Sequence, residues 1–449
     1  MSFKPKRTSQ QKFSKYEERR DSQEVSPEQV RKIKDRQKSR KEAQSPLSSE
    51  QEAALKSISV FLEENEPLFA QCQDWLFMRA HYIPELFYPD PEAKISRFAF
   101  SPQGRITCEQ SSFRAFRYLA QNCLPPKDRL HRQGPKCLLF AGFEGEEVPQ
   151  VGLVQPWEEG EFKPSYDVAL ILGTSSRAEN YVNFFRAFKC VRPGGLIVFS
   201  IANSLGAGSF EKNLRTLLPL QAQLSKYHCR TFAIQVPDSQ EELSQLNGAI
   251  EQWQESFAYV TCQESGLLSR PGIFSWNKLD GGSAFLAQYI REKADLQGVG
   301  ADLGSANGAL TKAVLESKAQ ERGLISRIDL FEDEYLALAA AKSQFKDKTG
   351  RVRLGFCWAD VIEDVPREQY DWIVMNPPFH QGQTRVLNLG REFVASASRA
   401  LTWRGTLYVV VNRTLPYEDT LKNYFEEFEK VVENNSFKVY KASKPIRID

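Results

Sequence analysis

Residues 298–308 read GVGADLGSANG, an apolar run that ends in an acidic residue and a glycine-rich turn. The next residues, LTKAVLESKAQ (310–320), have the spacing of an amphipathic helix. A strand that passes through glycines into a helix lets the backbone approach a ligand closely and offers it the free N–H groups of the helix N-terminus. The pattern predicts a nucleotide-like ligand at this turn, although such a turn can also serve packing alone.

Strands and helices alternate through both halves of the chain. In the second half, short apolar runs predict strands at ISRIDLFE (325–332), VRLGFCW (352–358), DWIVMNPPF (371–379) and GTLYVVVN (405–412). The first half repeats the pattern at KCLLFAGF (136–143), YDVALIL (166–172) and LIVFSIAN (196–203). This alternation is typical of parallel α/β sheets. YDVALIL and YDWIVMN, each followed by a turn and another strand, suggest an internal duplication.

The first 50 residues and the rest of the chain differ in net charge. Residues 1–50 hold 14 Lys and Arg against 8 Asp and Glu, a net of +6, so the total of +2 leaves −4 for residues 51–449. Because this leader is also poor in aliphatic residues, we predict a disordered basic tail over 1–50. Two folded domains are expected after it, at 51–268 and 269–449. The tail either attracts RNA phosphates or only adds solubility.

Composition excludes several classes of protein. No apolar run approaches the roughly 18 residues of a membrane helix, and the leader lacks the apolar core of a secretory signal. We therefore expect a cytoplasmic protein with no membrane partner. The eight cysteines form no CxxC pair and the four histidines are scattered, which predicts neither disulfides nor a metal site.

Three predicted strands end in side chains suited to an adenosine ligand. Asp302 opens the glycine-rich turn of the first strand. Glu332 ends the next strand, where a carboxylate can accept hydrogen bonds from both ribose hydroxyls; Asp333 and Glu334 are adjacent candidates for that role. Asp360 follows the third strand and could accept a hydrogen bond from an adenine amino group.

Asn376-Pro377-Pro378-Phe379 ends the fourth predicted strand. Prolines lack N–H groups and fix the chain, so that the Asn376 side-chain oxygen and the Pro377 carbonyl can both accept from one amino group. Two fixed acceptors would hold the nitrogen towards sp³ geometry and aim its lone pair at an electrophile. Phe379 could stack on a base turned out of its helix, and His380 contacts that base or a phosphate, or only caps the turn. The alternative is a proline turn beside a core Phe.

The glycine-rich turn, the Glu332 strand end, Asp360 and the Asn-Pro-Pro-Phe turn together resemble a class I S-adenosylmethionine-dependent methyltransferase acting on exocyclic nitrogen. Four further stretches are similar to the two-domain ribosomal RNA guanine-N2 methyltransferases: PGIFSWNKLDGGSAFL (271–286), MNPPFHQG (375–382), NRTLPYEDTL (412–421) and LSKYHCRTF (224–232). The resemblance covers nearly everything after the leader. One departure is Ala306, which stands in place of the family's middle glycine. We expect it to be tolerated if its φ stays negative.

The resemblance implies two tandem Rossmann-like folds, of which only the second binds cofactor and catalyses. The cofactor would be S-adenosylmethionine and the partner ribosomal RNA or a ribosomal subunit, with no metal; a monomer is compatible with the sequence. The implied cofactor contacts are Asp302, Gly304, Ala306, Gly308, Glu332, Asp360 and Asn376. The implied catalytic residues are Asn376, Pro377, Pro378 and Phe379, and the substrate contacts are Phe274, Phe379 and His380.

The first half departs from this pattern. KCLLFAGFEGEE (136–147) takes the place of the cofactor turn but lacks an acidic residue followed by glycine. Gly173-Thr174-Ser175-Ser176 stands where Asn-Pro-Pro-Phe would be. This half is therefore expected to be a degenerate methyltransferase-like domain that recognises RNA.

Two other classes of function remain compatible with these residues. The same proline turn can orient the N6 amino group of adenine or the side-chain amide of a protein glutamine. A non-catalytic RNA-binding factor for ribosome assembly is the second possibility, and Ala306 is the feature that favours it.

Overall fold

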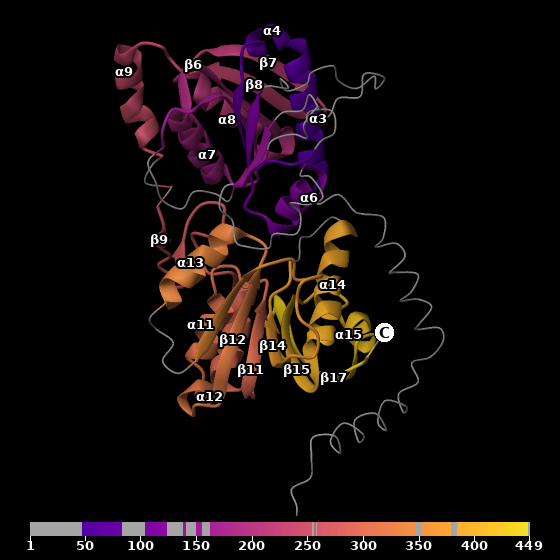
Figure 1. Cartoon of the computed structure of the whole chain (residues 1–449). Coiled ribbons are helices and arrows are strands. Elements are labelled where there is room, and N and C mark those ends of the chain that lie inside the picture. The colour runs from indigo at the N-terminus through magenta and orange to yellow at the C-terminus, as the bar shows by residue number, and fades with distance from the viewer. Residues whose placement is uncertain are drawn as a thin grey trace, which may run out of the picture. The chain divides into compact units, whose positions relative to one another are not determined.

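Each half of the chain builds one large sheet (Figure 1). The computed structural model describes residues 47–82, 104–123, 138–140, 150–154, 162–253, 256, 258–346, 352–378 and 384–447. Within these residues the first sheet has the strand order β3-β4-β2-β1-β5-β6-β8-β7 and the second has β13-β12-β11-β14-β15-β17-β16. Apart from β3, which has no counterpart in the second sheet, the two orders correspond strand for strand, as a duplication would produce. The prediction of two tandem α/β folds is confirmed.

The first sheet has a parallel centre and antiparallel edges. Pairing is parallel from β4 through β2, β1 and β5 to β6, whereas β3, β8 and β7 pair antiparallel. Its strands are β1 (Asp74–Met78), β2 (Arg105–Glu109), β3 (Leu138–Phe140), β4 (Gln150–Val154), β5 (Tyr166–Leu172), β6 (Val191–Ala202), β7 (Leu220–Lys226) and β8 (Cys229–Gln235). Its helices are α3 (Ser49–Glu64), α4 (Glu66–Phe69), α6 (Phe113–Cys123), α7 (Arg177–Cys190), η3 (Asn203–Leu205), α8 (Ala207–Arg215) and α9 (Gln240–Glu251).

The first described helix, α3, begins at Ser49. Ser48 caps α3 in a capping box, since its hydroxyl accepts from the Gln51 N–H and the Gln51 side chain accepts from the Ser48 N–H. The predicted disordered tail falls almost wholly outside the described residues. The boundary predicted between 268 and 269 stays a prediction, since contacts group Pro46–Pro445 into one compact unit.

The second sheet is arranged in the same way except that it has no counterpart of β3, so that its β13 edge is parallel. Its strands are β11 (Gly298–Leu303), β12 (Ile325–Glu332), β13 (Arg353–Trp358), β14 (Tyr370–Met375), β15 (Leu401–Asn412), β16 (Phe425–Glu433) and β17 (Phe437–Pro445). A two-stranded ladder of β9 (Val260–Thr261) and β10 (Leu268–Ser269) precedes it. The chain runs outward from β11 through β12 to β13, then returns to pair β14 on the other side of β11. Such a switch point opens a crevice at the carboxyl ends of β11 and β14.

Helices cover both faces of the second sheet (Figure 1). One apolar cluster involves α10 (Gly281–Glu292), α11 (Ala309–Leu315), α12 (Lys318–Glu321) and α13 (Tyr335–Phe345), and the other involves α14 (Thr384–Ala400) and α15 (Glu418–Lys422). Trp372 of β14 packs over Gly300 of β11, where a Cβ atom would lie 2.1 Å from the indole. This glycine therefore allows the two strands that flank the crevice to pack closely.

Most predicted elements are confirmed, with three differences. The helix predicted over 310–320 is divided into α11 and α12, because Ser317 ends one and caps the other. Among the described strands, β1, β2, β4, β7, β8, β16 and β17 were not predicted. KCLLFAGF was wrongly assigned to the cofactor-turn position of the first half: β3 lies at the sheet edge, and the counterpart of β11 is β1.

The turn after β1 still lacks an acidic residue followed by glycine, since Met78 leads into Arg79, Ala80 and His81. Among the described residues, no helix is both long and apolar enough to cross a membrane.

Aromatic contacts join α6 to the ends of β12 and β13. The Trp358 ring lies 5.2 Å from that of Phe113 and 5.0 Å from that of Phe116, between ring centroids. Its indole N–H donates to the carbonyl oxygens of Ser111 and Asp333. The segment before and within α6 thus contacts the edge of the second sheet that carries the predicted ribose and adenine acceptors.

Candidate active site

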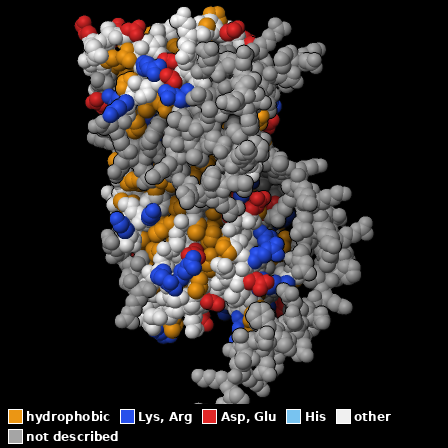
Figure 2. Space-filling view, in the orientation of Figure 1, with side chains coloured by type: hydrophobic (Ala, Val, Ile, Leu, Met, Phe, Trp, Pro, Cys, Tyr) orange, Lys and Arg blue, Asp and Glu red, His pale blue; other side chains and the backbone are white. Residues whose placement is uncertain are grey.

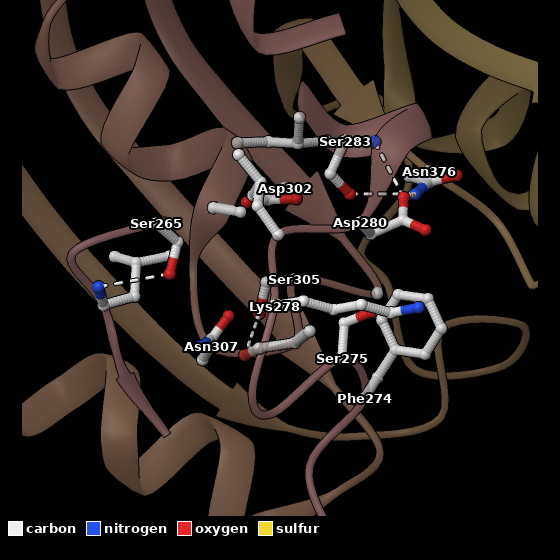
Figure 3. A pocket seen from close by; sticks show the side chains of 16 residues that line it. Ser265, Phe274, Ser275, Lys278, Asp280, Ser283, Asp302, Ser305, Asn307 and Asn376 are labelled. Carbon is white, nitrogen blue, oxygen red and sulfur yellow. Dashed lines mark hydrogen bonds between the residues drawn. The ribbon is translucent and has the colours of Figure 1, made fainter. Parts of the chain in front are cut away.

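A pocket opens at the carboxyl ends of β11 and β14 (Figure 3). Three segments supply its walls: residues between 265 and 283, the turn and helix start between 302 and 310, and Asn376 after β14. The described residues thus place an open pocket at the switch point, where ligands bind in sheets of this kind.

The glycine-rich turn uses left-handed backbone at three alternate positions. Gly304 has φ +70°, Ala306 φ +45° and Gly308 φ +88°. The condition under which Ala306 was expected to be tolerated, a negative φ, is therefore not met. Its N–H donates to Glu332 Oε2 at 2.6 Å, and this hydrogen bond helps hold the turn in a conformation that an L-residue rarely adopts.

Asp302 is fully buried at the base of the pocket. Its Oδ2 accepts from the N–H and the hydroxyl of Thr311, at 3.0 and 2.7 Å, whereas Oδ1 has no hydrogen-bond partner among the described residues. Burial raises the pKa of Asp302 to about 7, although the bonds from Thr311 act in the opposite direction. A cationic group in the pocket could donate a hydrogen bond to Oδ1. The ammonium group of the expected cofactor is such a group.

Glu332 lies at the end of β12 and braces the same turn. Its Oε1 accepts from the Glu334 N–H at 2.8 Å, and its Oε2 accepts from Ala306. Burial raises the pKa of Glu332 to about 8, against the effect of these two hydrogen bonds. Glu332 does not line the described pocket, so its contact with a ribose stays a prediction.

Asp360 is engaged by the first half of the chain. Its Oδ2 accepts from Arg117 at 3.1 Å and lies 3.3 Å from Arg114 Nε, and both arginines belong to α6. Its Oδ1 accepts from the Ile362 N–H at 2.9 Å. Binding an adenine amino group would therefore require Asp360 to share or rearrange these contacts, and that role also stays a prediction.

Asn376 lines the pocket beside Asp280 and Ser283, and its amide is hydrogen-bonded to both (Figure 3). Its Nδ2 donates to Asp280 Oδ2 at 2.7 Å and to Ser283 Oγ at 2.8 Å. The amide oxygen is thereby left free of these two partners. Pro377 and Pro378 follow with no N–H groups.

The predicted site residues are only partly brought together. Asp302, Gly304, Ala306 and Asn376 line one pocket with Phe274, which is 55% exposed. Gly308 lies next to this wall and starts α11, where a Cβ atom would lie 2.5 Å from Phe345. Phe379 and His380 lie outside the described residues.

Sequence reasoning missed Asp280 and Ser283. Both belong to LDGGS, a segment that supported the resemblance but received no role. An acidic residue followed by two glycines and a serine could have been identified as a helix N-cap. That is what the structure shows, since Asp280 caps α10 by accepting from the Ser283 N–H at 2.8 Å.

The known proteins to which this chain is similar include methyltransferases. Residues 264–441 match the model of the methyltransferase small domain. "Ribosomal RNA small subunit methyltransferase C" from Shewanella halifaxensis is 28% identical over 284 residues, which cover 62% of this chain and 77% of the relative. The protein of that name from Haemophilus influenzae (strain PittGG) is 24% identical over 326 residues, covering 68% and 93%. "Ribosomal RNA large subunit methyltransferase G" from Aliivibrio salmonicida is 28% identical over 188 residues, covering 41% and 48%.

A solved structure supports the two-sheet fold. It is the T. thermophilus 16S rRNA N2 G1207 methyltransferase in complex with AdoMet and guanosine, with a TM-score of 0.56 and 19% identity, covering 83% of this chain and 88% of that one. At this identity the likeness establishes the fold alone. By sequence, residues 264–441 match the methyltransferase small domain, and the chain is similar to ribosomal RNA small subunit methyltransferases.

Proposed function

We propose that the protein transfers a methyl group from S-adenosylmethionine to the exocyclic N2 amino group of a guanine in ribosomal RNA. One observation carries this proposal above the others. A buried carboxylate oxygen without a partner, on Asp302, and an amide oriented by two neighbours, on Asn376, line the same pocket. A site for a cationic ligand thus lies beside an acceptor for an amino group.

The residues around the turn would hold the cofactor. Asp302 would accept from its ammonium group, the turn through Gly304 and Ala306 would let the backbone approach it, and Glu332 would accept from its ribose. When bound, S-adenosylmethionine would supply an activated methyl group on a sulfonium centre.

Asn376 would prepare the nucleophile. The N2 amino group of guanine is a poor nucleophile because its lone pair is delocalised into the ring. Hydrogen bonds from this group to the Asn376 amide oxygen and the Pro377 carbonyl would favour sp³ geometry and leave the lone pair pointing at the methyl carbon. The nitrogen–carbon bond would form as the sulfur–carbon bond breaks, and the extra proton on nitrogen would leave to water. Phe379 would stack on the flipped base, with His380 beside it and Phe274 at the pocket edge.

Guanine is favoured over the other amines by similarity. The relative solved with AdoMet and guanosine is a guanine-N2 methyltransferase by its title, and the segments that flank the pocket here are those that resemble its family. Methylation of adenine N6 or of a glutamine side-chain amide would be an alternative outcome of the test. The non-catalytic alternative rested on Ala306. The left-handed φ of Ala306 shows that the turn forms despite the missing glycine.

The partner would be ribosomal RNA or a ribosomal subunit, met in the cytoplasm by a monomer. Residues 51–449 carry a net charge of −4, so RNA must find local basic groups or the basic leader. On the face shown in Figure 2, the described Lys and Arg side chains form several small groups interspersed with acidic ones. We propose the leader as a tether and the first half as the part that recognises RNA.

Transfer of a tritiated methyl group to ribosomal subunits from a strain that lacks the gene tests the proposal. We expect label in N2-methylguanine of one subunit's RNA, located by mass spectrometry. The Asn376→Ala protein should transfer almost none, whereas Asn213→Ala should be normal because that amide donates to the Tyr181 hydroxyl in the first half. Label on adenine or on protein, or no label at all, would overturn the assignment to guanine.

A further inference from the structure

Both hydrogens of the Asn376 amide are used by the start of α10. One is donated to Asp280 Oδ2 and the other to Ser283 Oγ. Asp280 Oδ2 also accepts from the Ser283 N–H, so the helix cap and the amide share one oxygen atom. Ser283 is only 8% exposed, and all three side chains converge beside the pocket (Figure 3).

This arrangement decides which end of the amide is free. A side-chain amide has nearly the same shape when it is turned over, so its partners set its orientation. A carboxylate accepts hydrogen bonds and does not donate them. The reversed amide would place its oxygen against the Asp280 carboxylate, lose that hydrogen bond, and present an NH₂ group to the pocket, although the Ser283 hydroxyl could then donate to the amide oxygen.

We propose that Asp280 and Ser283 are positioning residues that keep the Asn376 oxygen towards the substrate. They thereby select a substrate edge that carries an amino group over one that carries a carbonyl. This inference rests on the proposed function and deepens it, because it assigns the orientation of the acceptor to two residues outside the Asn-Pro-Pro-Phe turn.

The two glycines of LDGGS fit this role. A Cβ atom on Gly282 would lie 3.2 Å from Asp280 Oδ2 and 3.4 Å from Asn376 Nδ2, and one on Gly281 would lie 3.1 Å from the Phe437 ring. The first turn of α10 can approach the amide closely because these positions carry no side chain. The sequence between Asp280 and Ser283 is therefore suited to holding both acceptors against a third side chain.

Two variants of Asp280 separate positioning from helix capping. Asn, Asp and Ser are about equal as N-caps. Asp280→Asn keeps an oxygen at the same distance from the backbone and can reproduce both contacts. Asp280→Ser can keep the cap, but its oxygen is one atom closer to the backbone and withdraws from Asn376. Ser283→Ala removes one acceptor and leaves the capped N–H in place.

The assay is methyl transfer at saturating S-adenosylmethionine, with cofactor affinity measured by calorimetry. We expect kcat to fall about tenfold in Asp280→Ser and several-fold in Ser283→Ala, with Asp280→Asn within about twofold of wild type. Cofactor affinity should stay within about twofold in all three. The control is Ser244→Ala, which removes an exposed hydroxyl that donates to the Gln240 carbonyl on α9.

The decisive measurement repeats the substitutions in the Asn376→Ala protein. If Asp280 and Ser283 act through the amide, neither substitution lowers kcat further once the amide is gone. A full additional loss in that background, or a wild-type kcat in Asp280→Ser, overturns the inference and leaves the proposed function standing. A wild-type protein that methylates adenine or glutamine instead of guanine fails the proposed function, and the same variants then test the positioning role on that amine. A wild-type protein that methylates nothing overturns both.

Discussion

Replacing Ala306 by glycine should stabilise the protein, which is the reverse of the usual effect of glycine. Ala306 has φ +45° in the turn between β11 and α11. Left-handed backbone costs an L-residue about 1–2 kcal/mol because its Cβ crowds the following carbonyl. Ala306→Gly removes that cost but gives the unfolded chain more freedom, worth about 0.4–1 kcal/mol. The difference favours the variant by about 0.5–1 kcal/mol.

Thermal unfolding without ligand measures this difference. For a domain of this size the gain corresponds to a rise in Tm of about 1–4 °C. If the turn is already formed in the free protein, the strain at Ala306 is the same before and after a ligand binds. We therefore expect the Kd for S-adenosylmethionine to change by less than about twofold. Ala309→Gly is the matched control. Ala309 lies three residues further on, in the first turn of α11, where glycine should destabilise by up to about 1 kcal/mol.

The reasoning fails if both variants lower Tm by similar amounts. That result would mean that Ala306 does not hold a left-handed conformation in solution. A large loss of cofactor affinity in Ala306→Gly alone would refute a different step, the assumption that the turn is already formed in the free protein.

Three further predictions concern the same machinery. Asp302→Asn should weaken S-adenosylmethionine binding at least about tenfold in calorimetry, since it removes the buried charge that faces the pocket. Asp302 has a pKa of about 7 in the folded protein against 3.8 unfolded, so the folded state binds more protons between these values and wild-type stability should fall as pH rises from 4 to 7. In the ligand-free Asp302→Asn protein the free energy of unfolding should fall less over this pH range, by on the order of 1 kcal/mol. The same dependence on pH in both proteins, measured by urea unfolding, would contradict this. Asn376→Ala should lower kcat about 10²–10³-fold and leave the cofactor Kd within about twofold; a wild-type rate would remove the proposed role. Deleting residues 1–46, which spares the Ser48 cap, should weaken RNA binding at low salt and leave cofactor binding unchanged, while unchanged RNA affinity would reduce the leader to a solubility tail.

Long apolar runs made most of the fold predictable. ISRIDLFE and YDVALIL coincide with β12 and β5 because each is a buried strand bounded by polar or turn residues. β1, β2 and β4 were missed because five residues give too short a period to distinguish a strand from a helix. The antiparallel strands β7, β8, β16 and β17 were missed although they are longer. The position of KCLLFAGF was wrong because hydrophobicity says that a run is a strand but not where it lies in the sheet.

The site was predictable where it depended on chain order, and not where it depended on distant contacts. Parallel strands present their carboxyl ends at one edge, which is why Asp302 and Asn376 could be expected to meet. The hydrogen bond from Arg117 to Asp360 joins residues 243 positions apart, and no local sequence pattern indicates it. The positive φ of Ala306 was not predicted, although Gly304 and Gly308, two residues away on either side, already indicated a left-handed turn.

The contact of α6 with the end of β13 constrains how this protein can change over evolutionary time. Arg117 also reaches Glu363 and Asp364 beyond Asp360, and Trp358 lies against Phe113 and Phe116. A copy of the second half released from the first would leave an aromatic surface bare and a cluster of like charges without counter-ions. The first half can therefore be indispensable to the second through packing and charge alone, because the second half presents a surface that matches it.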